Sequence, residues 1–180
     1  YGKQAYIIKA RMQLMRDFGA YPSAHSAFLL NMGLDTLAVR MERYCENAMA
    51  VAEFLSRRPE VEKVSYPGLP GDKYHPLAEK YLPKGASGVI TLELKGGKEG
   101  GIAFIDALQL TSREVHVADI HSCALHPASA THRQLSGDQL AAAGIDPGLV
   151  RFSVGMESVE DSLPVSALSL INIGCGRRSG

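Results

Sequence analysis

The sequence predicts an α+β domain in which helices pack on one face of a small, mostly antiparallel sheet. Segments with the spacing of amphipathic helices and short alternating segments typical of strands follow one another without the strict alternation of a parallel α/β fold. Several alternating segments have one apolar side and one more polar side, as in a sheet buried on one face. With 180 residues, the chain is long enough to bury a core.

Helices are predicted for most of the first 56 residues. Between Tyr1 and Phe18, apolar residues recur at helical spacing, and Gly19 follows as a stop. A longer helical stretch is predicted from about Ser26 to Ser56, with a break near residues 33–36. One stripe of this stretch is apolar, so we expect it to be buried. The stripe consists of Met41, Tyr44, Ala48, Val51, Ala52 and Leu55.

Strands and short helices are mixed in the rest of the chain. The predicted strands are residues 61–66, 88–94, 114–118, 122–125 and 149–155. The predicted helices are residues 77–81, residues 99–108 and a short helix after Ser136. Ser136 and Gln139 have the spacing of a capping box, in which each side chain bonds the other residue's backbone amide.

The last predicted strand carries a charge inside an apolar pattern. Its alternation places Val150 and Phe152 on one side and Arg151 on the other. A partly buried guanidinium is costly unless an anion meets it, and its planar fork matches a carboxylate with two hydrogen bonds. From this strand alone, two interpretations remain open. Arg151 forms a structural ion pair with an Asp or Glu elsewhere, or it binds a ligand that carries a carboxylate.

The densest group of metal-ligand side chains lies between residues 116 and 132. It comprises His116, Asp119, His121, Cys123, His126 and His132. Imidazole, carboxylate and thiolate are all zinc ligands. If residues 119–125 are extended, however, Asp119, His121 and Cys123 share one side, and Ser122 and His126 share the other. These side chains then do not converge, and we predict no metal site.

Charge and composition argue against several classes of partner. The 19 basic and 19 acidic residues balance and form no long block of one sign, so neither nucleic acid nor a membrane surface is an expected partner. No apolar run approaches the ~18–20 residues that span a bilayer. The three cysteines, Cys45, Cys123 and Cys175, cannot all pair, which favours a reducing, cytoplasmic location.

Three long stretches of the sequence occur in the same order in a known enzyme family. They are MRDFGAYPSAHSAFLLNMGLDTLAVRM from residue 15, VEKVSYPGLPGDKYHPLAEKYLPKGASGVITLELKGG from residue 61, and HPASATHRQLSGDQLAAAGIDPGLVRFSVGME from residue 126. In these motifs the chain resembles the Cys/Met-metabolism enzymes that use pyridoxal phosphate. The similarity runs from Tyr1 to about Asp161.

The resemblance implies a fold and a domain organisation. Residues 23–161 would form the small C-terminal domain of a fold-type I pyridoxal-phosphate enzyme, which is aspartate-aminotransferase-like. Residues 1–22 would be the closing helix and linker of a large cofactor domain. In the family the Schiff-base lysine lies upstream of the matched residues, so we expect no catalytic or cofactor-binding residue in this chain and no activity of this piece alone. The intact family enzymes are usually homotetramers.

The resemblance also implies a role for two residues and a reaction. Arg151 would bind the α-carboxylate of a small amino-acid substrate, assisted by the backbone or hydroxyl of Ser122. The implied reaction is a γ-replacement that makes homocysteine, or methionine, from O-acetylhomoserine and sulfide, or a thiol. Cystathionine γ-synthesis and γ-elimination from methionine or cystathionine are alternatives within the family. An inactive, truncated remnant is a further alternative.

The C-terminal end departs from the family pattern. After residue 161 the family continues with an amphipathic helix, whereas this chain has Pro164, which a helix interior does not tolerate. We therefore interpret residues 162–180 as an aberrant tail, and our hypothesis is that a frameshift begins at Ser162.

Overall fold

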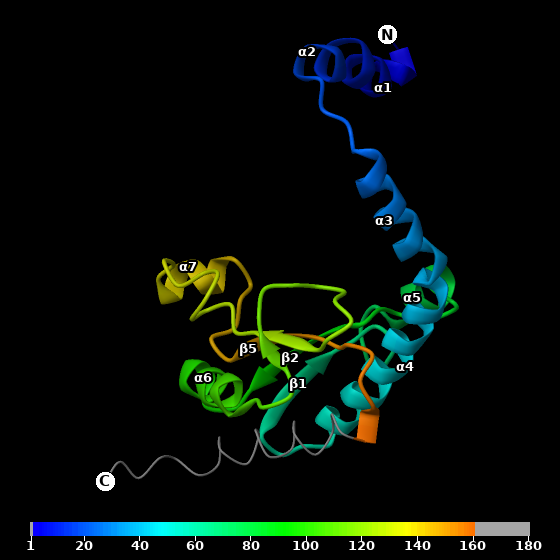
Figure 1. Ribbon diagram of the computed structural model, residues 1–180. Coiled ribbons are helices and arrows are strands. Elements are labelled where there is room, and N and C mark those ends of the chain that lie inside the picture. The colour runs from blue at the N-terminus through cyan, green and yellow to red at the C-terminus, as the bar shows by residue number, and fades with distance from the viewer. Residues whose placement is uncertain (1, 161–180) are drawn as a thin grey trace. The chain divides into compact units, whose positions relative to one another are not determined.

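The computed structural model of the chain describes residues 2–160 (Figure 1). The described residues divide into two compact units between Ala38 and Val39. The domain boundaries derived above stay predictions, and residues 162–180, for which we predicted an aberrant tail, lie outside the described residues.

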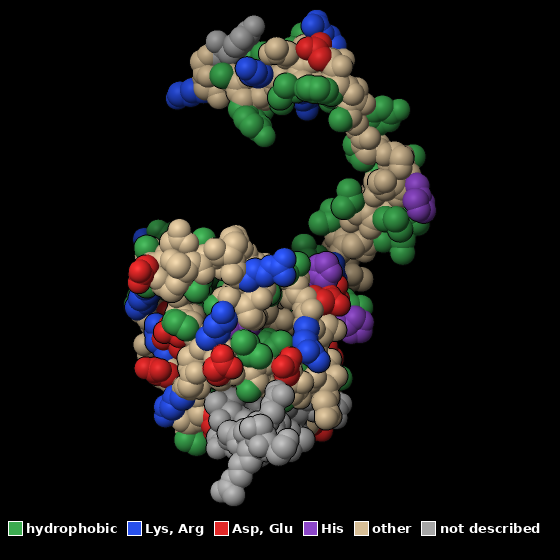
Figure 2. Space-filling model, turned by 90° about the vertical axis from the view of Figure 1, so that its left-hand side faces the viewer, with side chains coloured by type: hydrophobic (Ala, Val, Ile, Leu, Met, Phe, Trp, Pro, Cys, Tyr) green, Lys and Arg blue, Asp and Glu red, His purple; other side chains and the backbone are tan. Residues whose placement is uncertain are grey.

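The first unit is helical, as the sequence predicts. It contains a 3-10 turn (Gly2–Gln4), α1 (Ala5–Lys9), a π-helical stretch (Ala10–Met15), α2 (Arg16–Phe18) and α3 (Ala24–Asp35). The stop at Gly19 is confirmed, because this glycine takes the left-handed conformation, φ +65°, that ends helices. Ser23 caps α3 by accepting a hydrogen bond from the Ser26 amide at 3.1 Å. None of these helices contains a buried residue, and their hydrophobic side chains lie at the surface (Figure 2).

The second unit is built on a five-stranded sheet of order β1-β2-β5-β4-β3 (Figure 1). The strands are β1 (Val61–Ser65), β2 (Val89–Leu94), β3 (Ser112–Arg113), β4 (Cys123–Leu125) and β5 (Leu149–Ser153). Every pair is antiparallel except β3–β4, so the predicted mostly antiparallel sheet is confirmed.

Helices of this unit bury one side of the sheet. They are α4 (Leu37–Ser56), α5 (His75–Tyr81) and α6 (Gly97–Ala107), each of which contributes to the core. The unit also contains α7 (Gly137–Ala142). Alternate residues of β2 and β5, such as Leu92 and Phe152, join Leu55 of α4 and Phe104 of α6 in a single hydrophobic core. The capping box predicted for α7 is present.

Two local predictions are wrong. Met41 is 40% exposed, because the apolar stripe of α4 is buried only from Tyr44 onward. Residues 114–118 form a loop rather than a strand. The pairing of β3 with β4 ends at Arg113, and Ala118 takes a positive φ of 64° that an extended strand does not contain.

Candidate functional site

Arg151 lies at the centre of the strand β5, which is itself central in the sheet. It is paired with Thr91 of β2 on one side and with Leu125 of β4 on the other. The preceding and following residues, Val150 and Phe152, point into the helix-covered core. The pleat therefore directs Arg151 to the opposite side of the sheet, as the alternation predicts.

The Arg151 guanidinium is held by backbone carbonyls of a loop. Its Nη2 donates to Val115 O at 2.7 Å and to His116 O at 3.2 Å. Its Nε is buried and, among the described residues, has no hydrogen-bond partner. No carboxylate of the described residues forms an ion pair with it, so a structural ion pair is not found there. A buried, unpaired cationic donor is costly, and an incoming carboxylate would satisfy it.

The carbonyl-bearing loop, residues 114–121, is fastened to the same side of the sheet. Cys123 Sγ donates to His116 O at 3.0 Å, and the Ala118 amide donates to Ser153 Oγ at 3.1 Å. Cys123 and Ser153 face each other across β4 and β5. The loop is therefore anchored beside Arg151 on its own strand, β5, and on the neighbouring strand β4, which fixes the direction of the carbonyls that hold the guanidinium.

Ser122 precedes β4 and is only 2% exposed. Its hydroxyl donates to Glu157 Oε2 at 2.8 Å and accepts from the Gly155 amide at 2.8 Å. Its own amide donates to Glu157 Oε1 at 2.5 Å. The pleat of β4 places this side chain on the side of the sheet away from Arg151. The role of Ser122 in binding a substrate carboxylate stays a prediction.

Glu157 is the residue of this region that sequence reasoning missed. It lies four residues beyond β5, where no strand or helix period constrains it, so its partner could not be read from the pattern. The usable indication was chemical, because a carboxylate just after a strand end seeks amide and hydroxyl donors.

The group of metal-ligand side chains does not assemble. Within residues 2–160, no three His, Cys, Asp or Glu side chains are placed to hold an ion. His126 is bonded through Nδ1 to Ser129 Oγ at 2.8 Å and through Nε2 to Pro147 O at 2.7 Å. Both of its ring nitrogens are therefore occupied by hydrogen bonds within the protein.

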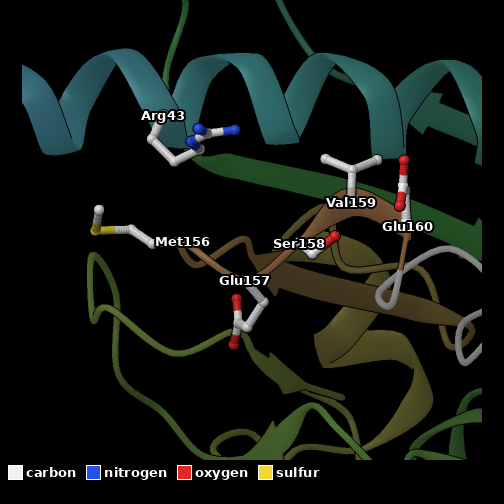
Figure 3. A pocket seen from close by; sticks show the side chains of 6 residues that line it. All are labelled: Arg43, Met156, Glu157, Ser158, Val159 and Glu160. Carbon is white, nitrogen blue, oxygen red and sulfur yellow. The ribbon is translucent and has the colours of Figure 1, made fainter.

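The described residues contain an open pocket of about 660 Å³ beside α4 (Figure 3). It is lined by Arg43, Met156, Glu157, Ser158, Val159 and Glu160. Arg43 is 3.8 Å from Glu46, and two of the lining residues are carboxylates. The two lining carboxylates disfavour the binding of a further anion in this pocket. A substrate carboxylate therefore fits Arg151 better than this pocket.

Cys123 offers a pH-dependent test of the packing around Arg151. Burial raises the pKa of its thiol above the ordinary value. The folded state thus favours the protonated thiol, and the stability linked to it is present below the unfolded thiol's pKa and is lost as pH rises through the raised pKa. We expect iodoacetamide at pH ~8.5 to modify Cys123 about tenfold more slowly than the more accessible Cys45.

Peptide mapping by mass spectrometry measures the two alkylation rates separately. Unfolding in urea is the control, because it should equalise the rates. Equal rates in the folded chain would contradict a buried thiol beside the loop.

The sequence and the fold of this chain match a known enzyme family. The model of the family "Cys/Met metabolism PLP-dependent enzyme" matches residues 2–164. The chain belongs to this family. The enzymes of this family depend on pyridoxal phosphate. The solved structure of one relative confirms the predicted α+β fold class. That structure, an O-acetylhomoserine (thiol)-lyase from Campylobacter jejuni subsp. jejuni with a pyridoxyl-lysine, has a TM-score of 0.85 and 35% identity. The match covers 95% of this chain and 41% of that one.

Relatives in the Cys/Met family carry more than one activity name. An O-acetyl-L-homoserine sulfhydrylase from Leptospira meyeri is 46% identical over 170 residues, which are 94% of this chain and 38% of the relative. An L-methionine gamma-lyase from Pseudomonas putida is 45% identical over 163 residues, 90% of this chain and 41% of the relative. The chain thus spans about two fifths of the length of these relatives.

The lysines of this family member share one property in the structure, which is that they lie on the surface. All eight are exposed: Lys3, Lys9, Lys63, Lys73, Lys80, Lys84, Lys95 and Lys98. None of them lines the pocket beside α4, and Lys63 Nζ is paired with Glu93 Oε1 at 3.0 Å. No helix in residues 2–160 is long and apolar enough to span a membrane.

Proposed function

We propose that this chain is the substrate-carboxylate-binding portion of a pyridoxal-phosphate-dependent γ-replacement enzyme. The enzyme would make homocysteine, or methionine, from O-acetylhomoserine and sulfide, or a thiol. The observation that supports this proposal most is the hydrogen bonding of Arg151. Its buried Nε has no partner among the described residues, while its Nη2 is held by two backbone carbonyls. A carboxylate that binds there gains a charge-assisted hydrogen bond to a donor that otherwise has no partner among the described residues.

The task of the chain in this reaction is orientation. Arg151 would fix the α-carboxylate, and the carbonyls of residues 115 and 116 would fix Arg151. Holding the substrate at this end sets the direction of its remaining bonds, which lowers the entropic part of the barrier. Pyridoxal phosphate supplies the electron sink of the family's chemistry. Since all lysines here are exposed, we assign the Schiff-base lysine to a segment outside this chain and expect the chain alone to be inactive.

A fusion protein tests the reaction. In it, this chain replaces the matching 170 residues of the Leptospira meyeri sulfhydrylase, and the unmodified relative is the control. We expect sulfide-dependent formation of homocysteine from O-acetylhomoserine. Release of ammonia from methionine instead would assign a γ-lyase, which the 45% identity to the Pseudomonas putida enzyme supports as the second candidate. A fusion that binds the cofactor but catalyses neither reaction would identify a remnant.

The purified chain tests the assignment of the lysine. We expect that titration with pyridoxal phosphate gives no imine band that borohydride fixes to one lysine. A stable, reducible band on a single lysine would contradict the proposal. A homotetrameric assembly and a cytoplasmic location complete the proposal, on the resemblance and on the unpaired cysteines respectively.

A further inference from the structure

Glu157 makes two hydrogen bonds with one residue. Its carboxylate accepts from the amide of Ser122 through Oε1 and from the hydroxyl of Ser122 through Oε2. The same hydroxyl accepts from the Gly155 amide, so Ser122 uses both of its donors and its hydroxyl oxygen within the protein. Figure 3 shows the Glu157 side chain directed away from α4, on which Arg43 lies, whereas Val159 extends toward that helix.

The backbone around Glu157 is also held from the helix side. Asn47 Nδ2 of α4 donates to Gly155 O at 3.0 Å and to Glu157 O at 2.9 Å. A Cβ on Gly155 would collide with Glu157 Oε2 and would lie 2.5 Å from the Ser122 amide nitrogen. The segment after β5, residues 154–157, therefore fits closely between α4 and Ser122, the residue before β4.

This network fixes one end of the loop that holds Arg151. The loop, residues 114–121, presents the carbonyls of Val115 and His116 to the guanidinium near its beginning. It ends directly before Ser122, which Glu157 binds. The Met156 amide donates to Ile120 O at 2.9 Å. The segment after β5 therefore contacts this end of the loop at two points, Ile120 and the adjoining Ser122.

We propose that Glu157 is a positioning residue for the carboxylate site. It acts through Ser122 on the loop whose carbonyls orient Arg151, and it does not contact the substrate. This inference rests on the proposed function and extends it to a residue on the other side of the strand pair. It also gives Ser122 a specific task, because the serine transmits the constraint from Glu157 to the loop.

The test measures Arg151 directly in the complete chain. In ¹⁵N-labelled protein, the Nε–H of Arg151 reports its burial and its fixed orientation through hydrogen exchange. Glu157→Gln keeps the size of the side chain but replaces one acceptor by an NH₂ donor that opposes the Ser122 hydroxyl. We expect it to speed Nε–H exchange about tenfold, since the loop opens more often. Glu160→Gln, an exposed position three residues on, is the matched control and should leave the rate unchanged.

Kinetics in the fusion protein complete the test. Glu157→Gln should raise KM for O-acetylhomoserine about tenfold, with kcat changed less than about threefold. The increase should be smaller in a Ser122→Ala background, because the two residues act in series. If Glu157→Gln does not fold, Glu157→Asp and Ser122→Ala alone should speed the exchange. A lowered melting temperature with unchanged Nε–H exchange and KM would overturn the proposal. An inactive wild-type fusion with the expected exchange result would refute the proposed function and leave Glu157 as a positioning residue.

Discussion

Replacing Arg151 with alanine is expected to raise KM for O-acetylhomoserine and lower kcat together in the fusion protein, so that kcat/KM falls about a hundredfold or more. Both constants change because the guanidinium binds the substrate and also orients it. The fold should persist, because Arg151 lies on the side of β5 opposite the core. Steady-state assays of homocysteine formation, with circular dichroism as a folding check, measure the effect.

Two further variants separate charge from shape. Arg151→Lys keeps the positive charge but lacks the planar fork and the Nε donor, so we expect only a small part of the lost kcat/KM to return. Arg133→Ala removes an exposed guanidinium and should leave both constants unchanged. An Arg151→Ala fusion with unchanged kcat/KM would disprove the assignment of Arg151.

The sequence predicts Arg151 because its environment is a local property of a strand. A charge at the centre of an alternating apolar segment must lie on the other side from its neighbours, and this follows from strand geometry alone. The groups that hold the guanidinium lie 35 and 36 residues away, on a loop that the pattern indicated as a strand. Periodicity describes how a segment faces a core, and this loop does not face one.

The same reasoning explains the accuracy of the fold prediction. The alternation of β2 and the stripe of α4 from Tyr44 onward were correct because both are buried in the core of the second unit. Met41 continues the helical stripe but remains 40% exposed, since a sequence pattern does not say where along a helix the burial begins. The contact of Glu157 with Ser122 depends on the turn at Gly155 and has no periodic counterpart.

Phe152 is expected to be the most costly single truncation near the site. Its side chain is 1% exposed and lies between Ile90 of β2 and Ala124 of β4. Phe152→Ala removes an aromatic ring from the centre of the core and leaves a cavity, because the neighbouring strands are fixed by their ladders. We expect the free energy of unfolding to fall by about 3–5 kcal/mol. Urea unfolding followed by far-UV circular dichroism measures this change.

The matched control removes the same atoms from the surface. Phe28 of α3 is 59% exposed, and Phe28→Ala should change the free energy of unfolding by less than about 1 kcal/mol. Phe152→Ala should also weaken the carboxylate site, because Arg151 is held in register by the strand that Phe152 anchors to the core. A Phe152→Ala chain as stable as the Phe28→Ala chain would mean that β5 is not packed as described, and the orientation of Arg151 would lose its structural basis.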